Sequence, residues 1–573
     1  MFRFFFCLVW CLSWAALAAA QEPADLILTG GKISLVDEKA TEAEAIAVAG
    51  DKILAVGSTE EIARHRGPTT QVIDLAGRRV IPGMIESHGH LTAMGEAMLR
   101  VDLSTAESWE EIVARIDNAA RSTPEGQWIV GNGWHQSKWK SPPADNVEGY
   151  PVCTALDKVS AKHPVILRHA SGHMIFANSA AMAAAKVDAS TKPPPGGEIL
   201  RFEDGRPTGA FRETAADRIE GALARWEAAR PREARRAELL RAIDLATKEC
   251  LKQGVTTFGD AGSALSTIAL YKSLIDEGKM PIRLWVMLSE SNDVLRQKLA
   301  DAKVIGYGDQ RLTVRGIKRM ADGALGTHGA LLLAPYDDLP MKTGLEVDRL
   351  ADIEVTARLA AQHGFQLCVH AIGDKANRDI LDLFERVQKE LAPGEKLRWR
   401  IEHAQHLDPA DIPRFKQLGV IASMQGVHCT SDAPYVVQRL GMRRAEAGAY
   451  VWRSLLDAGA VIANGTDVPV EKVDPIACFY SSVTRKMPTG VAFFPQQCMT
   501  RHEALVSYTR AAAYAQFEEA NRGSLEVGKL ADLVVLSGDL LEVPDEKIRE
   551  VKVDLTLVGG KVLYDRAKEE VRP

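Results

Sequence analysis

Two histidines separated by one residue are the first group in the chain with clear chemical capacity. His88 and His90 follow the apolar run Val80-Ile81-Pro82-Gly83-Met84-Ile85 and flank Gly89. On an extended strand, positions i and i+2 point to the same side, so both imidazoles can reach one metal ion. A His-x-His pair alone is a weak signal, because most such pairs in loops bind nothing. The interpretation therefore depends on what other ligands the chain supplies.

Four further side chains that can bind a metal follow apolar segments later in the chain. Imidazole and carboxylate are suitable zinc ligands, and a coordination position left open for water makes such a site catalytic rather than structural. We therefore predict a divalent metal site, with zinc as the expected ion and one or two ions per chain. The additional candidate ligands are Lys318, His370, His403 and Asp467.

Lys318 and Asp467 have distinct predicted roles. A buried lysine among cations is pushed towards its neutral amine. That amine can add carbon dioxide to give a carboxylated lysine able to bridge two metals; the alternative is a surface or salt-bridged lysine. Metal ions lower the pKa of bound water to about 7 and polarise a carbonyl under attack. Asp467 would take the proton of that water and pass it to the leaving group, which makes it the predicted catalytic residue; the alternative is a cap on the next helix.

An alternation of strands and helices must position these side chains. The helix predicted between residues 235 and 252 has Leu239, Ile243, Ala246 and Cys250 on one face, with Gly254 just past its end. Eight such β/α units predict an α/β fold of the (β/α)8 TIM-barrel type, in which catalytic groups sit at the carboxyl ends of the strands. A doubly wound open sheet is the alternative. One predicted strand precedes His88. The other seven span residues 255–258, 282–287, 316–318, 365–369, 398–401, 420–423 and 461–463.

Both ends of the chain differ from this α/β middle in their predicted secondary structure. Short β-type runs punctuated by Gly and Asp fill residues 21–80, and matching runs fill residues 516–573. We expect the two to complete one composite β-sandwich beside a barrel spanning residues 81–515. A long insertion at about residues 95–235 interrupts the barrel, and insertions at the catalytic end of a barrel commonly form lids and substrate walls.

The first 20 residues are typical of a cleaved secretory signal peptide. Arg3 precedes an apolar core, and a run of small residues ends at Ala20. The alternative is an uncleaved anchor, but the apolar segment is short for a membrane span. We therefore expect a secreted or periplasmic protein that has no membrane partner after cleavage.

Composition excludes several other kinds of partner. The chain is 46% hydrophobic and 25% charged with a formal net charge of −6, and it lacks a basic run, so no nucleic-acid partner is expected. Cysteines are too sparse and too widely spaced for a disulfide scaffold. The sequence leaves open whether the chain forms a homo-oligomer.

Several motifs resemble those of the amidohydrolase superfamily, and more narrowly its YtcJ-like family 3 branch, which includes N-substituted formamide deformylase. The resemblance covers residues from about 24 to 565. It implies a metal-dependent hydrolase with a barrel and a composite sandwich, and a metal site built from His88, His90, carboxylated Lys318, His370, His403 and Asp467. The motifs are residues 82–90, 318–323, 369–374, 400–405, 465–469 and 523–534, with Gly172-His173 preceding Asn178.

The sequence departs from the family pattern at two points. Thr466 stands where the family often has Ser, and the residue after Gln425 is Gly426 where the family often has Pro. The second departure puts the substrate wall at Gln425 and His428 in doubt, but not the metal site. As substrate-binding residues we predict His173, Trp134 and Asp322.

These observations predict a hydrolase of a non-peptide C–N bond, of amide or formamide type, acting on a small-molecule amide substrate. Metal-dependent lactone or ester hydrolysis on the same fold is one alternative. A catalytically silent secreted binding protein is another, although the complete ligand set argues against it.

Overall fold

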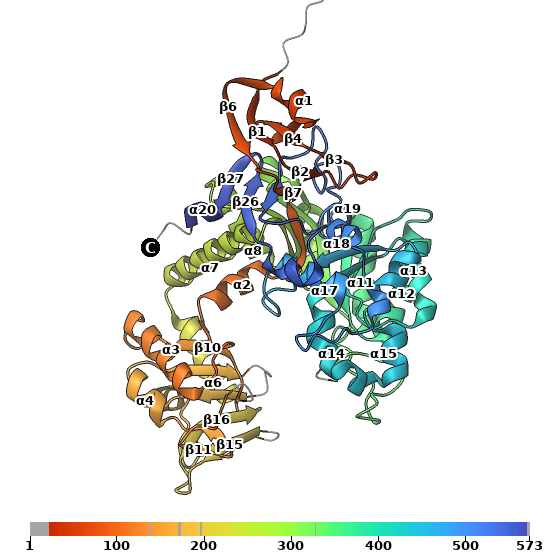
Figure 1. Ribbon diagram of the computed structural model, residues 1–573. Helices are drawn as coiled ribbons and strands as arrows, with labels where there is room; N and C mark the ends of the chain where they lie inside the picture. Colours follow the sequence, from red (N-terminus) through yellow and green to blue (C-terminus); the bar gives the residue numbers. More distant parts are fainter. Residues whose placement is uncertain (1–21, 137–138, 170–173, 195–196, 327, 570–573) are drawn as a thin grey trace, which may run out of the picture.

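The computed structural model describes residues 22–136, 139–169, 174–194, 197–326 and 328–569. Figure 1 shows a central barrel with a small β-domain at one end and a separate lobe at the other. The predicted signal peptide lies outside the described residues. Within the described chain, none of the helices combines the length and apolar character needed to cross a membrane.

Eight parallel strands form the barrel, in the order β24-β23-β22-β21-β20-β18-β17-β8. Most of their residues are buried, as expected for parallel strands covered by helices on the outside. Backbone hydrogen bonds from Asp467 N to His88 O and from His90 N to Val468 O, both 2.8 Å, join the last strand's end to the first strand's end. The predicted (β/α)8 fold is thus confirmed. The strands are β8 (Met84–Gly89), β17 (Val255–Ser263), β18 (Arg283–Leu288), β20 (Leu312–Met320), β21 (Gln366–Ala371), β22 (Arg400–His403), β23 (Ile421–Gln425) and β24 (Val461–Gly465).

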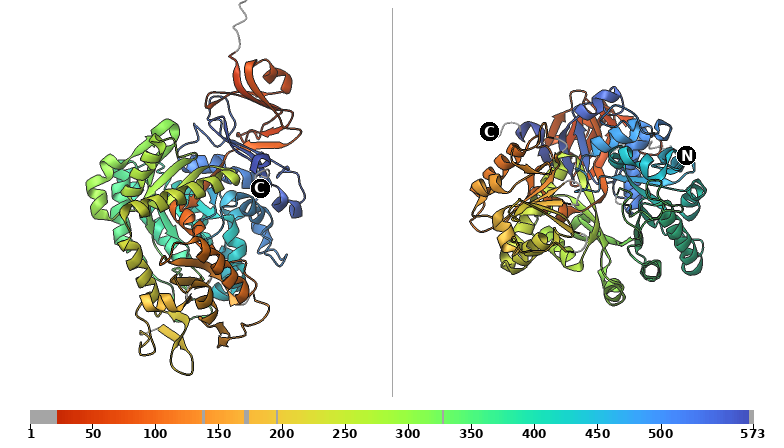
Figure 2. Two further views of the ribbon diagram at one scale, coloured as in Figure 1. Left: turned by 90° about the vertical axis from the view of Figure 1, so that its left-hand side faces the viewer. Right: turned by 90° about the horizontal axis from the view of Figure 1, so that it is seen from below.

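Amphipathic helices surround the barrel (Figure 2). The helix expected at residues 235–252 is α7, and its residues Ile243, Ala246 and Cys250 are buried against the strands. Helix α12 places Ile380, Leu381 and Phe384 in the same core. The principal helices are α7 (Arg232–Lys252), α8 (Leu265–Asp276), α9 (Asn292–Ala302), α11 (Leu350–His363), α12 (Asp374–Leu391), α14 (Gly426–Leu440) and α17 (Pro475–Thr484).

Two sheets form the small β-domain. One has the order β5-β4-β1-β6, and the other, β27-β26-β25-β7-β2-β3, combines strands from both ends of the chain. Leu28 and Ile46 from the first sheet pack with Leu533 and Leu557 from the second, so the predicted composite sandwich is present. Its strands are β1 (Ala24–Thr29), β2 (Lys32–Ser34), β3 (Glu42–Ala43), β4 (Ala45–Ala49), β5 (Lys52–Gly57), β6 (Arg66–Asp74), β7 (Arg79–Pro82), β25 (Leu533–Leu536), β26 (Val553–Val558) and β27 (Lys561–Asp565).

A buried ion pair ties this sandwich to the barrel. Arg283, on barrel strand β18, donates to both carboxylate oxygens of Asp532 at 2.7 and 2.9 Å, and Gly559 N donates to the same carboxylate at 2.8 Å. Both charged side chains are almost fully buried. The sandwich therefore serves as a fixed platform for the barrel.

The insertion folds as a lobe with its own sheet, ordered β15-β16-β14-β13-β10-β9, and its own hydrophobic core. Helices α2 and α7 lead into and out of it (Figure 1). They approach so closely at Gly95 that a Cβ there would lie 2.0 Å from Ala242 O, which requires glycine. The elements are α2 (Leu91–Met98), β9 (Val101–Asp102), α3 (Trp109–Ser122), β10 (Ile129–Trp134), α4 (Thr154–Ser160), β13 (Val165–His169), β14 (Met174–Ala177), α5 (Ser179–Ala184), β15 (Gly197–Arg201), β16 (Pro207–Glu213) and α6 (Asp217–Ala229).

Candidate metal centre

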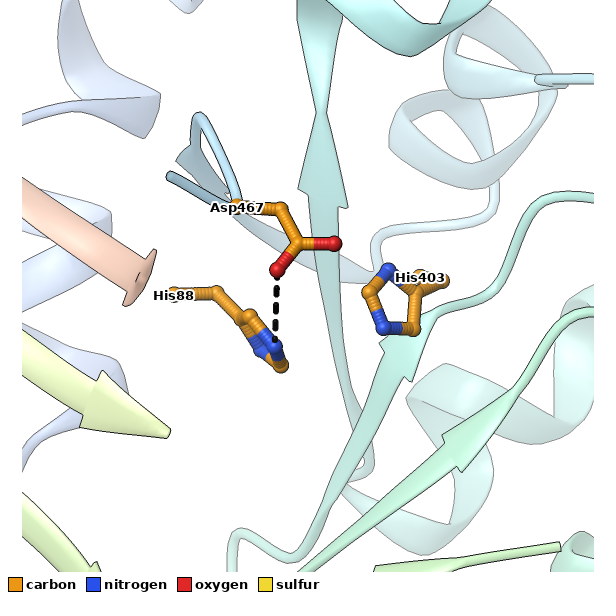
Figure 3. Close-up of side chains that lie close together, drawn as sticks. All are labelled: His88, His403 and Asp467. Carbon is orange, nitrogen blue, oxygen red and sulfur yellow. Dashed lines mark ion pairs between the residues drawn. The ribbon is translucent and has the colours of Figure 1, made fainter. Parts of the chain in front are cut away.

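The His-x-His pair lies at the carboxyl end of β8, at the mouth of the barrel. His88 is 1% exposed, while His90 precedes helix α2 and keeps 35% of its side chain accessible. Figure 3 shows His88, His403 and Asp467 facing one another from different strand ends. Their ligand atoms all lie within 4.8 Å of one another.

The remaining predicted ligands join the same group. Lys318 Nζ lies 3.2 Å from His88 Nε2, and His90 Nε2 lies 3.3 Å from Asp467 Oδ1. The rings of His370 and His403 are 4.4 Å apart between centroids. The structure therefore brings together all six side chains that the sequence analysis named, from the ends of five strands.

The tautomers of two imidazoles suit a metal. His88 Nδ1 donates to Glu402 Oε2 at 2.5 Å, and His403 Nδ1 donates to Gln425 Oε1 at 2.8 Å. Each ring then presents the lone pair of Nε2 to the cluster, which is how metal-binding histidines are usually oriented. His370 Nε2 is buried and has no hydrogen-bond partner among the described residues. These two imidazoles and the carboxylate of Asp467, with the unpartnered Nε2 of His370 nearby, suit a zinc-type ion.

Burial also puts these groups in the protonation states that ligands need. Burial, with the nearby Lys318 charge, lowers the pKa of His88 to about 4 and that of His370 to about 3, so both rings are neutral at pH 7. Burial likewise lowers the pKa of Lys318. Burial alone would raise the pKa of Asp467, but His90, His88 and His403 together hold it well below its usual range.

Glu402 and Arg400 support the centre and were not among the predicted residues. Both are fully buried inside the barrel, two residues apart on β22. Arg400 Nε donates to Glu402 Oε1 at 2.7 Å, and its Nη2 donates to Ser87 O at 2.9 Å and Ser423 Oγ at 2.7 Å. In the sequence, Arg400 and Glu402 occupy alternate positions of a predicted buried strand, which places both charged side chains on the same side of it.

The hydroxyl of Thr466 makes a hydrogen bond to the buried carboxylate of Glu86. This carboxylate accepts hydrogen bonds at 2.8 Å from both the backbone N and the Oγ1 of Thr466, and one at 3.1 Å from His88 N. Burial raises the pKa of Glu86 to about 7. Because a threonine hydroxyl makes this contact as a serine hydroxyl can, the departure from the family pattern leaves the site intact.

The structure places two of the three predicted substrate contacts, Trp134 and Asp322, in buried positions. Trp134 has no exposed surface; its indole N–H donates to Leu167 O at 3.1 Å inside the core of the insertion lobe. Asp322 is also fully buried, and its oxygens accept from the backbone N–H groups of Leu331, Ile372 and Gly373 at 2.8–2.9 Å. Both side chains are thus engaged with the protein's own backbone, and Asp322 Oδ1 lies 3.6 Å from His370 Nε2. His173 lies outside the described residues.

A metal-dependent hydrolase barrel is the class of protein that this fold and this cluster define. The chain belongs to the amidohydrolase family, whose model matches residues 71–564. The predicted family and the prediction of a hydrolase acting on non-peptide C–N bonds are therefore confirmed at the level of the family.

Several individual proteins are similar over nearly the whole chain. The protein LONG AFTER FAR-RED 3 of Arabidopsis thaliana is 34% identical, covering 96% of this chain and 94% of its own. The putative amidohydrolase YtcJ of Bacillus subtilis is 30% identical over 94% of this chain and 99% of its own. N-substituted formamide deformylase of Arthrobacter pascens is 29% identical, with coverages of 95% and 98%.

A solved structure shares the architecture. The crystal structure of an uncharacterized metal-dependent hydrolase from Pyrococcus furiosus superimposes with a TM-score of 0.71 at 28% identity, covering 90% of this chain and 100% of that one.

Proposed function

We propose that this chain hydrolyses a small-molecule amide, of the N-substituted formamide type, with a zinc-type centre of one or two ions. The observation that carries the proposal is the cluster of Lys318, four histidines and Asp467 at the barrel mouth. The similarity to a formamide deformylase over 95% of this chain supports the choice of substrate class.

The chain's own residues would hold the ion and manage the proton. His88, His90, His370 and His403 would ligate through neutral imidazoles, together with Lys318 and Asp467. A divalent metal in such a site activates water as a nucleophile and polarises a carbonyl. Asp467, ionised at neutral pH, is placed to accept a proton and then release it to the leaving amine.

Carboxylation of Lys318 belongs to the same proposal. The amine would form an N–C bond to carbon dioxide and lose a proton, giving a carbamate with two ligand oxygens. Support comes from burial of the amine and its lowered pKa, which favours the neutral nucleophile. In 13C-bicarbonate, a carbamate NMR resonance present in the wild type and absent from Lys318→Arg would test this step.

Metal content per chain tests the centre. We expect about two zinc ions per chain by elemental analysis in protein purified without chelator, falling in Lys318→Ala, if the two-metal form of the bridged centre is right. One ion, unchanged in the variant, would remove the bridge while leaving a hydrolase. No metal, and no gain on adding it, would contradict the proposal and favour a binding protein.

A panel of matched substrates tests which type of bond the enzyme hydrolyses. Formanilide, acetanilide, phenyl acetate and γ-butyrolactone separate formamide, amide, ester and lactone hydrolysis. We expect formanilide to be hydrolysed fastest, with activity lost after chelation and restored by zinc. Turnover of the ester or lactone alone would instead favour an esterase or lactonase on this fold.

Export is the last part of the proposal. Residues 1–20 have the composition of a signal peptide, so the mature enzyme would begin near Gln21 and work in a secreted or periplasmic location. N-terminal sequencing of the protein from the source cell, after fractionation, tests this. An intact Met1 in the cytoplasmic fraction would contradict it.

A further inference from the structure

His428, which the family resemblance places at the substrate wall, is a buried imidazole beside the predicted metal centre with no chemical role assigned above. It lies in the first turn of α14, just after strand β23, and is 6% exposed. Its ring is nearly parallel to that of His403, with 6.3 Å between centroids and 17° between planes. It is also among the side chains close enough to Asp467 to affect the pKa of that carboxylate.

The hydrogen bond made by one ring nitrogen identifies the tautomer. Gln405 Nε2 lies 3.2 Å from His428 Nδ1. An amide nitrogen can only donate, so Nδ1 accepts and the ring proton resides on Nε2. Nε2 therefore has no lone pair to offer a metal, which distinguishes His428 from His88 and His403, whose Nδ1 atoms donate.

The Nε2–H group of His428 lacks a partner. It is buried, and in the described part of the chain no acceptor lies within hydrogen-bond distance. A buried donor left unsatisfied costs free energy, and native proteins retain one where a ligand or substrate completes it. This free donor belongs to a ring that neighbours His403 and Asp467, two of the predicted metal ligands.

We propose that His428 is a catalytic residue whose Nε2–H donates a hydrogen bond to the carbonyl oxygen of the scissile amide. This inference rests on the proposed function, because it takes the acceptor to be an amide carbonyl. The oxygen gains negative charge as the carbonyl is attacked, so a fixed donor strengthens its bond there more than in the ground state. Gln405 has the positioning role, since it fixes the tautomer.

Two substitutions separate the ring's two hydrogen bonds. In His428→Gln the side-chain amide can reach the position of Nε2, which keeps the donor to substrate. In His428→Asn the shorter amide can reach only the position of Nδ1, beside Gln405. We expect kcat for formanilide to fall about 100- to 1000-fold in H428N and much less in H428Q, as for loss of an oxyanion donor. His363→Asn, on the exposed end of α11, is the matched control.

Metal content distinguishes contact of His428 with the substrate from binding of His428 to the metal, which activity alone does not. Both His428 variants should keep the metal stoichiometry of the wild type. Loss of metal in both would make His428 a ligand and overturn the inference, and so would equal activity of H428N and wild type.

The inference can fail separately from the proposed function. If the wild type hydrolyses no amide, the proposed function fails, and the tautomer is then read directly. Selective 15N-histidine labelling should show the resonance of protonated Nε2 in wild type, absent from H428N, shifting on addition of formate as a carboxylate probe. A deprotonated Nε2, or no shift with formate, would overturn the inference.

Discussion

Replacing Glu402 by Gln should weaken metal binding even though Glu402 itself touches no metal. Its Oε2 accepts from His88 Nδ1 at 2.5 Å, so the carboxylate fixes the ring and increases the electron density of the ligand nitrogen. Supporting carboxylates of this kind contribute about 10- to 100-fold in metal affinity, or about 1.4 to 2.7 kcal/mol. Gln keeps an acceptor oxygen in place but removes the charge, so we expect the metal Kd to rise by about tenfold in a chelator competition titration.

The same substitution has a second cost that must be separated from the first. Arg400 is fully buried and would lose its countercharge, and removal of one partner of a buried pair destabilises by about 3–5 kcal/mol. Arg400→Met combined with Glu402→Gln removes both charges and should recover much of this stability, measured by urea unfolding in chelator. Metal affinity should stay low in the double variant.

Glu518 provides the matched control. It forms a buried ion pair with Arg522, 3.2 Å apart, and accepts from Thr313 Oγ1 at 2.7 Å. Glu518→Gln should therefore lower stability without changing the metal Kd. Wild-type affinity in Glu402→Gln, or an equal loss in Glu518→Gln, would refute the reasoning.

Three further changes test other contacts. Asp467→Asn should keep the fold by circular dichroism but lose kcat by about 100-fold or more, because the amide cannot take a proton; turnover near the wild-type rate would contradict this. Gln425→Leu should raise the metal Kd by about tenfold in the chelator titration, because His403 loses the acceptor that fixes its tautomer. Asp532→Asn should lower unfolding stability by about 3–5 kcal/mol by leaving Arg283 unpaired. Burial would raise the pKa of Asp532, yet Arg283 holds it below its usual value. The stabilisation is therefore complete above the unfolded pKa of about 3.9 and is lost as pH falls through the lower native pKa, so urea unfolding of the wild type, but not of the variant, should lose this contribution there.

The barrel and the convergence of the candidate ligands were predictable because both depend on local patterns. Short apolar runs ended by a polar side chain mark buried parallel strands, and the carboxyl ends of such strands meet at one mouth. Lys318, His370 and Asp467 each follow such a run. The predicted barrel then places these residues near one another, although they are far apart in the sequence.

The sequence could not predict the surroundings of side chains that bond to distant backbone. Trp134 follows a Gly-Asn-Gly run that fits a substrate wall as well as a core, and only the fold shows that Leu167 O accepts its indole proton. Asp322 follows a strand as a ligand would, but three backbone N–H groups from two distant segments surround its carboxylate. No local pattern encodes such convergence.

Backbone conformation directs two of the candidate ligands in a way that alternation along a strand does not predict. Glu402 faces the barrel interior, so a regular strand would direct His403 outward. Instead His403 has φ +77°, and Asp467 has φ +58° at the end of its strand. Such left-handed conformations cost about 1–3 kcal/mol each in residues other than glycine. They persist because Gln425 holds the ring of His403 and Asp467 N donates to His88 O. The barrel thus stabilises a strained backbone at the two positions where the imidazole and the carboxylate must turn towards a common point.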